Sequence, residues 1–516
     1  MKWTNVLLLF IGAVLWSCSS SPLKEQYQEI DLLITNGKVV DGTGKTAYEA
    51  DVFILNGKVV HIGKENTKGL KIKRTIDAEG KVVTPGFIDL HSHGSPERTP
   101  AFENFLAMGV TTITLGQDGF SPYHENLKDW QDSLSAKGTG TNIAMFVGHG
   151  TLRELSGIGR KEIPSEEELE RMKTLLANNL VHCFGMSTGL EYTPALYAQE
   201  AELLELAKVV GEKGGMIMSH MRNEDDPELL QSIEELCRQG EFAPVHVSHL
   251  KSVYGKGEER AKEIIAFMQE QRAKGVQLTA DIYPYNASYT GIAIVFPEWA
   301  KTKEQFEVAK KERREELETF IRNKVISRNG PEATLLGTAP YKGKTLADLE
   351  KEMGKPFEQI LIDEIGPEGA SAAYFVMNDE LQTRLLTDSL LSVCSDGSPT
   401  SHHPRGHGTF AKLIEEYVNK RQVLSLEEAV RKVTAYPAGI LKLQDRGTLK
   451  VGHKADVLIF DPAAVHATAE YSDPKQLAEG FEYVVVNGKV AREKGVLSEE
   501  LYGEMLKPLS SVAKEL

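Results

Sequence analysis

Residues 85–93 read Pro85-Gly86-Phe87-Ile88-Asp89-Leu90-His91-Ser92-His93, which joins a turn, a short apolar run and a His-X-His pair. Side chains alternate along an extended chain, so His91 and His93 lie on the same face of the predicted strand. Two imidazoles at the end of a strand are typical of a metal site. Asp89 shares this face and is placed to orient one of the imidazoles from behind.

Three later segments repeat the pattern of an apolar run that ends in a residue able to bind a metal. They end at His220, His249 and Asp396. Two imidazoles from one strand, two more from separate strands and a late aspartate make a pocket suited to Zn²⁺ or a similar divalent ion. The sequence therefore predicts a metal-dependent hydrolase.

Apolar β-branched runs alternate with amphipathic helical stretches between these motifs, which indicates parallel strands. The strand-like runs are 110–115, 142–147, 215–218, 245–247, 277–282 and 391–394, and helical spacing covers 166–178, 198–212, 226–239 and 257–274. Functional residues at the ends of parallel strands are typical of an eight-stranded barrel. We expect an α/β fold whose (β/α)8 TIM-like barrel spans 85–445, with a charged, helix-prone insertion at about 299–373.

Short strands with glycine turns occupy both ends of the chain. Asn-Gly-Lys-Val follows an apolar run at Asn36, Asn56 and Asn487, and Asn-Gly is a frequent hairpin turn. We therefore expect hairpins at these positions. Matching β segments at the two ends predict one small β-sandwich domain, built from residues 31–84 and 446–505.

The first eighteen residues are predicted to be a signal peptide. Residues 6–15 are apolar but too short to span a bilayer comfortably, and Leu15-Trp16-Ser17-Cys18 resembles a bacterial lipobox. Cys18 would then carry lipid and residues 19–30 would form a tether. We expect a lipoprotein that faces the periplasm, with Ser19 favouring the outer membrane; an ordinary signal peptide cut nearby is the alternative.

The remaining composition is that of a large globular protein. A net charge of −15 and the lack of a basic tract argue against a nucleic-acid partner. Cys183, Cys237 and Cys394 cannot form a closed set of disulfides. Cys394 lies in an apolar run and is expected to be a buried barrel residue, with metal ligation as the alternative.

Asp396 is expected to move the catalytic proton. A carboxylate beside a metal can take the proton of the attacking water and return it to the leaving amine. An Asp-Gly turn without a chemical role is the alternative. His149, at the end of another strand, either contacts substrate or fills the barrel mouth, and His246 is expected to be structural because it faces away from His249.

The motifs resemble those of the amidohydrolase superfamily and, within it, the D-aminoacylase (N-acyl-D-amino-acid deacylase) family. The resemblance covers about residues 31–488 and is carried by 85–93, 109–112, 187–192, 220–224, 248–251, 395–397, 403–405 and 408–410. It implies a metal-dependent amidase that hydrolyses N-acyl-D-amino acids to a carboxylate and a free D-amino acid by attack of a metal-bound hydroxide. The expected cofactor is one or two Zn²⁺ ions, or another divalent metal.

One position departs from the family pattern. D-aminoacylases that resemble this chain usually carry a cysteine ligand in a Gly-Asn-Cys-Gly turn, where this chain has Gly116-Gln117-Asp118-Gly119. A carboxylate can bind one metal or bridge two, and it is a harder ligand than a thiolate. Asp118 is therefore either a ligand or a loop residue beside a one-metal site. The metal set is expected to be His91, His93, Asp118, His220, His249 and Asp396.

The resemblance also implies a substrate-binding set of Tyr192, Lys251, Tyr283 and Arg405. Cationic side chains and tyrosine hydroxyls suit the free carboxylate of an acylated amino acid. Ser288 is a weaker candidate. The alternatives in function are another reaction of the superfamily (dipeptidase, cyclic amidase or deaminase) and a non-catalytic surface lipoprotein. The expected partner is a small-molecule substrate, with membrane contact only through the lipid anchor.

Overall fold

The computed structural model describes residues 23–509. The predicted signal peptide, the lipobox at Cys18 and the start of the tether lie outside these residues. Within them, no helix combines the length and the apolar character needed to cross a membrane.

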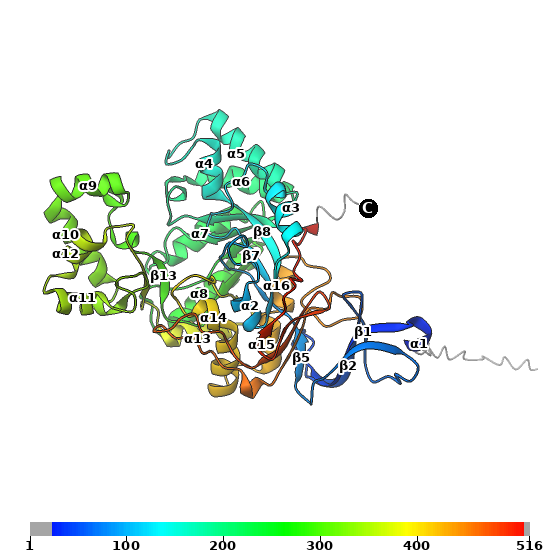
Figure 1. Ribbon diagram of the computed structural model, residues 1–516. Helices are drawn as coiled ribbons and strands as arrows, with labels where there is room; N and C mark the ends of the chain where they lie inside the picture. The colour runs from blue at the N-terminus through cyan, green and yellow to red at the C-terminus, as the bar shows by residue number, and fades with distance from the viewer. Residues whose placement is uncertain (1–22, 510–516) are drawn as a thin grey trace, which may run out of the picture.

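Eight parallel strands form the nearly closed barrel that the sequence predicted (Figure 1). They are β6 (Phe87–Asp89), β7 (Val110–Leu115), β8 (Asn142–Gly148), β9 (Gly185–Gly189), β10 (Met216–His220), β11 (Val245–Val247), β12 (Leu278–Ile282) and β16 (Leu391–Val393). β6 and β16 are the two ends of this sheet, and a bridge between Ser92 and Gly397 joins them just beyond the strands. The barrel therefore closes at the level of the predicted metal ligands.

Helices cover the outside of the barrel, and those at 166–179, 200–212, 229–239 and 257–273 match the four predicted helical stretches. They are α2 (Glu103–Ala107), α3 (Leu127–Lys137), α4 (His149–Ser156), α5 (Glu166–Asn179), α6 (Glu200–Glu212), α7 (Leu229–Gln239), α8 (Gly257–Ala273), α13 (Asp379–Thr387), α14 (Arg405–Lys412), α15 (Leu426–Lys432) and α16 (Ala435–Ile440). Their apolar faces and the strands share one core of fully buried residues, including Phe87, Ile113, Ile217 and Ile264.

Strand β9 was not predicted, because Gly185-Met186-Ser187-Thr188-Gly189 lacks the β-branched and aromatic residues typical of strands. Its glycines have a packing role. A Cβ atom on Gly185 would lie 1.9 Å from the carbonyl oxygen of Met216, and one on Gly189 would lie 2.1 Å from that of Asp118. The two glycines thus allow the backbone at Met216 and at Asp118 to pack closely against β9, and this contact positions the loop that carries Asp118.

The two chain ends together build a second sheet, in the order β20-β19-β18-β17-β5-β1-β2-β3, with β4 also paired to β1. Its strands are β1 (Glu29–Val39), β2 (Tyr48–Leu55), β3 (Lys58–Ile62), β4 (Lys71–Asp77), β5 (Val82–Pro85), β17 (Val457–Phe460), β18 (Phe481–Val486), β19 (Lys489–Glu493) and β20 (Val496–Leu497). Hairpins form at Asn56 and Asn487 as expected. The hairpin predicted at Asn36 is wrong: this residue lies within β1 at a register shift, with φ 54°.

The chain leaves the barrel between β12 and β16 to form a separate lobe (Figure 1). A three-stranded sheet stands at its base, made of β13 (Ser288–Gly291), β14 (Thr334–Leu336) and β15 (Ser371–Tyr374). Beyond the sheet lie α9 (Lys303–Glu312), α10 (Arg314–Ser327), α11 (Leu346–Met353) and α12 (Phe357–Ile360), packed on a core of their own. We refer to residues 288–374 as the insertion lobe.

Candidate metal centre

His91 and His93 follow β6 directly and face Asp396, which follows β16. His93 Nε2 lies 3.2 Å from Asp396 Oδ1, and His91 Nε2 lies 3.8 Å from the same oxygen. The backbone N–H of Asp396 donates to the carbonyl of His91 at 2.8 Å, and that of His93 donates to the carbonyl of Gly397 at 2.8 Å. Barrel closure is thus what brings the first histidines and the late aspartate together.

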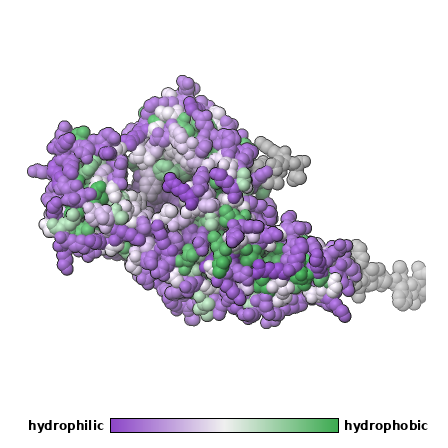
Figure 2. Space-filling view, in the orientation of Figure 1, coloured by the Kyte–Doolittle hydropathy of each residue, from purple (hydrophilic) through white to green (hydrophobic). Residues whose placement is uncertain are grey.

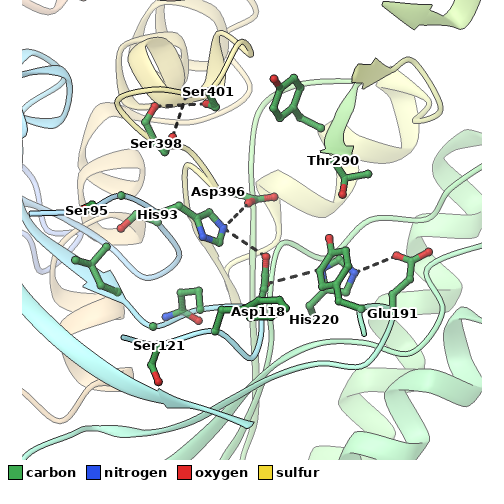
Figure 3. Close-up of a pocket in the computed structure, with 18 of the residues that line it drawn as sticks. His93, Ser95, Asp118, Ser121, Glu191, His220, Thr290, Asp396, Ser398 and Ser401 are labelled. Carbon is green, nitrogen blue, oxygen red and sulfur yellow. Dashed lines mark hydrogen bonds and ion pairs between the residues drawn. The ribbon is translucent and has the colours of Figure 1, made fainter. Parts of the chain in front are cut away.

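Asp118 lies in the middle of the cluster (Figure 3). Its Oδ1 is 3.2 Å from His91 Nε2 and 3.3 Å from His249 Nε2, and its Oδ2 is 3.4 Å from His93 Nε2. Ser187 of β9 holds the turn: its hydroxyl donates to the carbonyl of Gly116 and accepts from the N–H of Gly119. Asp118 itself has φ 54°, an uncommon value for a non-glycine residue.

His220 and His249 complete the cluster from the ends of β10 and β11. His220 Nδ1 lies 3.0 Å from His249 Nε2 and 3.8 Å from Asp118 Oδ1. Each ring has a carboxylate at its other nitrogen: Glu191 Oε2 is 3.1 Å from His220 Nε2, and Glu224 Oε1 is 3.2 Å from His249 Nδ1. Carboxylates in this position fix the tautomer and orientation of metal-binding histidines.

The spacing of these atoms fits divalent ions. Ligands about 2.0–2.1 Å from a tetrahedral ion lie roughly 3.3 Å from one another, and Asp118 meets three imidazoles at 3.2–3.4 Å. Neither nitrogen of the fully buried His91 makes a hydrogen bond with the described residues, and Nε2 has only its ion-pair contacts with Asp118 and Asp396. Two groups with ligand atoms within 4.8 Å share Asp118, namely His91, His93, Asp118 and Asp396, and Asp118, His220 and His249.

Both carboxylates of the cluster are held ionised. Burial alone would raise the pKa of Asp396, but Arg405, His249 and His93 outweigh it, so this pKa lies well below its usual range. Arg405 Nη1 is 2.7 Å from Asp396 Oδ2. The pKa of Asp118 is also well below its usual range, because its histidine neighbours outweigh the effect of burial. Ionised carboxylates are the form that binds a metal.

A cavity of about 770 Å³ opens above the cluster. Figure 2 shows the molecular face hollowed between the insertion lobe and the barrel. Tyr192, Lys251 and Arg405 of the predicted substrate-binding set line this cavity. Lys251 Nζ donates to both oxygens of Glu224, at 2.6 and 2.7 Å. Tyr283 is fully buried, with the guanidinium of Arg405 4.9 Å from its ring centre.

Other residues singled out in the sequence have structural partners. His149 is buried and lies 2.7 Å from Glu202, which also pairs with Arg153. His246 lies 2.9 Å from Asp281, which in turn accepts the backbone N–H of His249. Asp89 accepts the backbone N–H groups of His91 and Ser395 instead of binding an imidazole, and Cys394 is a free, buried thiol.

Sequence reasoning missed three residues around the cluster: Glu191, Glu224 and Arg328. The first two lie within motifs that resemble the family, in Ser187–Tyr192 and four residues after His220, but neither was assigned a role. Arg328 belongs to the insertion lobe and reaches the cavity only through the fold. No local sequence signal marks it.

Comparison with known proteins gives a consistent result. A sequence profile of the amidohydrolase family matches residues 346–492. The chain is 30% identical to an N-acyl-D-glutamate deacylase from Alcaligenes xylosoxydans xylosoxydans over 89% of this chain and 93% of that protein. It is 28% identical to an N-acyl-D-aspartate deacylase from the same organism over 95% and 97% of the two chains.

This chain belongs to the D-aminoacylase family of amidohydrolases. Its fold matches a solved structure of N-acyl-D-glutamate deacylase from Bordetella bronchiseptica, complexed with zinc and a phosphonate that mimics the tetrahedral intermediate (TM-score 0.81, 28% identity, 93% of this chain and 100% of that one). It also matches a D-aminoacylase described as having a binuclear metal centre, with activation by one metal and attenuation by the second (TM-score 0.79, 27% identity, 93% and 100%). The D-aminoacylase family thus supplies two-metal precedents for a cluster shared through Asp118.

Proposed function

We propose that the protein hydrolyses N-acyl-D-amino acids to a carboxylic acid and a free D-amino acid. The observation that carries this proposal is the convergence of four histidines and two aspartates at separations that fit divalent ions. His93, Asp118, His220 and Asp396 of this cluster line one cavity. His91, His93, Asp118 and Asp396 would hold one ion, and Asp118, His220 and His249 a second. Zn²⁺ suits this set of imidazole and carboxylate ligands.

The protein side chains prepare the proton transfers. A bound divalent ion supplies two effects: it acidifies water and polarises the amide carbonyl. Asp396 accepts the proton of the attacking water at Oδ1, the oxygen that faces the cluster, while Arg405 occupies Oδ2. The same oxygen then returns the proton to the leaving nitrogen. Glu191 and Glu224 keep His220 and His249 oriented during both transfers.

The upper cavity wall would bind the free carboxylate of the substrate. Tyr192 lies over the cluster, with its ring centre 4.5 Å from that of His220. Lys251 and Arg405 are already paired with Glu224 and Asp396, so a substrate carboxylate would share these cations with them. The relatives that act on N-acyl-D-glutamate and N-acyl-D-aspartate support a D-configured substrate.

The test is release of free amino acid from matched N-acetyl-D- and N-acetyl-L-amino acids. We expect turnover with D substrates in the presence of Zn²⁺, loss of turnover after chelation, and recovery when Zn²⁺ is returned. Metal-independent turnover, or hydrolysis of the L series alone, would contradict the proposal.

We also propose that the protein is a lipoprotein facing the periplasm. Support comes from the apolar segment 6–15 and from Leu15-Trp16-Ser17-Cys18 in the sequence. Metabolic labelling with a radioactive fatty acid should mark the wild-type protein and not Cys18→Ala. Equal labelling of both proteins, or of neither, would rule out the anchor.

A further inference from the structure

The cavity wall above the ion-binding cluster has a cationic half. Lys251, Arg328 and Arg405 are the lysine and arginine residues that line the cavity within the described chain, and all three belong to residues 191–405. Arg405 reaches towards the insertion lobe, since its Nη2 donates to the carbonyl of Tyr289 in β13 at 3.3 Å. Under the proposed function, Lys251 and Arg405 bind the free carboxylate of the substrate, so this half of the wall takes the anionic end.

The other half of the wall is formed by residues 92–145 and contributes no lysine or arginine to the described cavity lining. Its loops follow β6 and β7. In Figure 3, Ser95 and Ser121 of these loops lie on one side of Asp118, whereas Glu191 and Thr290 lie on the other. The cluster that would hold the ions therefore lies between a cationic half and a half without cations.

Aromatic side chains are prominent in this second half. Phe120 and Tyr123 line the cavity from one loop, and they are 49% and 69% exposed. Pro96, Pro122 and the buried Trp130 line it with them. We refer to these residues together as the apolar wall. Exposed aromatic side chains gathered at a concave surface are typical of a site that binds an apolar group.

The loop that carries Phe120 is held on both sides of this residue. The backbone N–H of Ser121 donates to the hydroxyl of Thr151 at 3.0 Å, and this hydroxyl donates to the carbonyl of Ser121 at 3.2 Å. On the other side, the carbonyl of Gly119 accepts the N–H of Thr151 at 3.1 Å. The aromatic ring is thus presented to the cavity by a fixed backbone, which lowers the entropic cost of binding a ligand against it.

Apolar surface continues from this wall to the cluster. The ring centre of Phe120 lies 6.4 Å from that of Tyr192, whose ring centre lies 4.5 Å from that of His220. Leu115 and Met145 are buried apolar residues that also line the cavity. A ring or chain attached to a carbonyl group at the cluster could therefore contact apolar side chains along its length.

The carboxylates of this half favour a neutral ligand. Asp118 belongs to the cluster, and Glu97 is the other acidic residue among the cavity-lining residues of 92–145. Glu97 accepts hydrogen bonds from Trp130 Nε1 and, at 2.9 Å, from the Ser95 hydroxyl. Its charge would repel an anion placed against the apolar wall.

We propose that the apolar wall binds the acyl group of the substrate and that the protein prefers a large apolar acyl group, such as phenylacetyl or hexanoyl, over acetyl. The inference rests on the proposed function. The reacting amide divides the substrate into an anionic amino-acid half and a neutral acyl half. Charge complementarity then places the first half against Lys251 and Arg405 and the second against the apolar wall.

A substrate series that varies the acyl group alone tests the site. Acetyl, hexanoyl and phenylacetyl derivatives are compared on one D-amino acid, either leucine or glutamate. We expect the kcat/KM of wild type to be roughly 10- to 100-fold higher for at least one of the two larger groups than for acetyl. The double variant Phe120→Ala, Tyr123→Ala should lower kcat/KM for that larger group about 10-fold or more and leave the acetyl substrate within about threefold.

Controls separate acyl recognition from misfolding and from recognition of the amino-acid side chain. Phe320→Ala removes another exposed phenylalanine, in α10 and outside the cavity lining, and should leave the acyl preference unchanged. Phe120→Leu keeps an apolar side chain and should retain more of the preference than Phe120→Ala. A second series keeps the acetyl group and varies the D-amino acid, and Phe120→Ala should leave the order of these substrates as it is in wild type.

The outcomes distinguish this inference from the proposed function. If wild type hydrolyses N-acyl-D-amino acids without preferring a larger acyl group, or if the double variant keeps that preference, the acyl site is refuted while the deacylase function stands. The same holds if the variants slow all acyl groups equally, or if they change the order of amino acids instead. If metal-loaded wild type hydrolyses no N-acyl-D-amino acid with any of the three acyl groups, the proposed function fails and the inference falls with it.

Discussion

Replacing Asp118 by alanine should remove metal from both halves of the cluster. Asp118 is the residue common to the two ligand groups, with Oδ1 3.2 Å from His91 Nε2 and 3.3 Å from His249 Nε2. Asp118→Ala leaves the histidines in place and takes away the one carboxylate that contacts both groups. The expected result is a loss of metal as well as of rate.

The size of the effect follows from ligand number. A structural zinc site with four ligands contributes about 10–16 kcal/mol of binding free energy, so one ligand is worth roughly 3 kcal/mol, or ~10²-fold in affinity. Asp118→Cys offers one sulfur near the position of Oδ1 but nothing for His93, which Oδ2 meets at 3.4 Å. The cysteine variant should therefore retain part of its Zn²⁺ and part of its activity.

Metal content after dialysis against a defined Zn²⁺ buffer is the assay, combined with turnover of an N-acetyl-D-amino acid. Asp225→Ala is the matched control, because Asp225 lines the same cavity but lies outside the two ligand groups around Asp118. It should keep the metal content of wild type. Full metal loading and normal turnover in Asp118→Ala would refute the bridging role and reduce Asp118 to a loop residue.

Two further variants test the chemistry around the cluster, and a third tests how stability depends on pH. Asp396→Asn keeps the shape but not the base, so turnover should fall roughly 10²- to 10⁴-fold; near-normal steady-state kcat would exclude the proton transfer assigned to it. Glu191→Gln removes the carboxylate that lies 3.1 Å from His220 Nε2. This change should weaken Zn²⁺ binding about 10- to 100-fold in a competitive chelator titration. Unchanged affinity would show that Glu191 does not orient His220 for metal binding. Burial and, to a smaller extent, Lys475 lower the pKa of His407 to about 4. The unfolded chain therefore takes up a proton on this histidine at a higher pH than the folded protein does. As a result, the free energy of unfolding falls as the pH decreases from about 6.5 to 4. In urea unfolding, the free energy of unfolding of His407→Asn should fall by up to ~3 kcal/mol less than that of wild type across this pH window. Parallel pH profiles for the two proteins would contradict this.

The barrel was predictable because its strands carry strong local signals. Val110–Leu115 is entirely apolar or β-branched and was predicted with its observed bounds. β9 was not, since its glycines serve close packing against Met216 and Asp118, a tertiary requirement without a local pattern. Asn36 was misassigned for a related reason: the same Asn-Gly pair permits a hairpin or a bulge, and the pairing of β1 with β2 decides between them.

The histidines and Asp396 could be proposed from sequence because each ends an apolar strand, and parallel strands present their ends at one rim. Two kinds of information were out of reach. The order of ligands around Asp118 depends on how barrel closure brings β6 and β16 together. Arg328 reaches the cavity from an inserted lobe whose docking no spacing in the sequence reveals.

The metal requirement and the preference for D substrates can be measured together by titrating metal-free protein with Zn²⁺ and following turnover of paired N-acetyl-D- and N-acetyl-L-amino acids at each step. The metal cluster predicts no turnover without metal and activity that rises with the first one or two equivalents bound. The proposed function, whose D configuration comes from the relatives, predicts that this activity is on the D series, with little or none on the L series. Turnover by the metal-free protein, or equal rates for the two series, would contradict a metal-dependent D-aminoacylase.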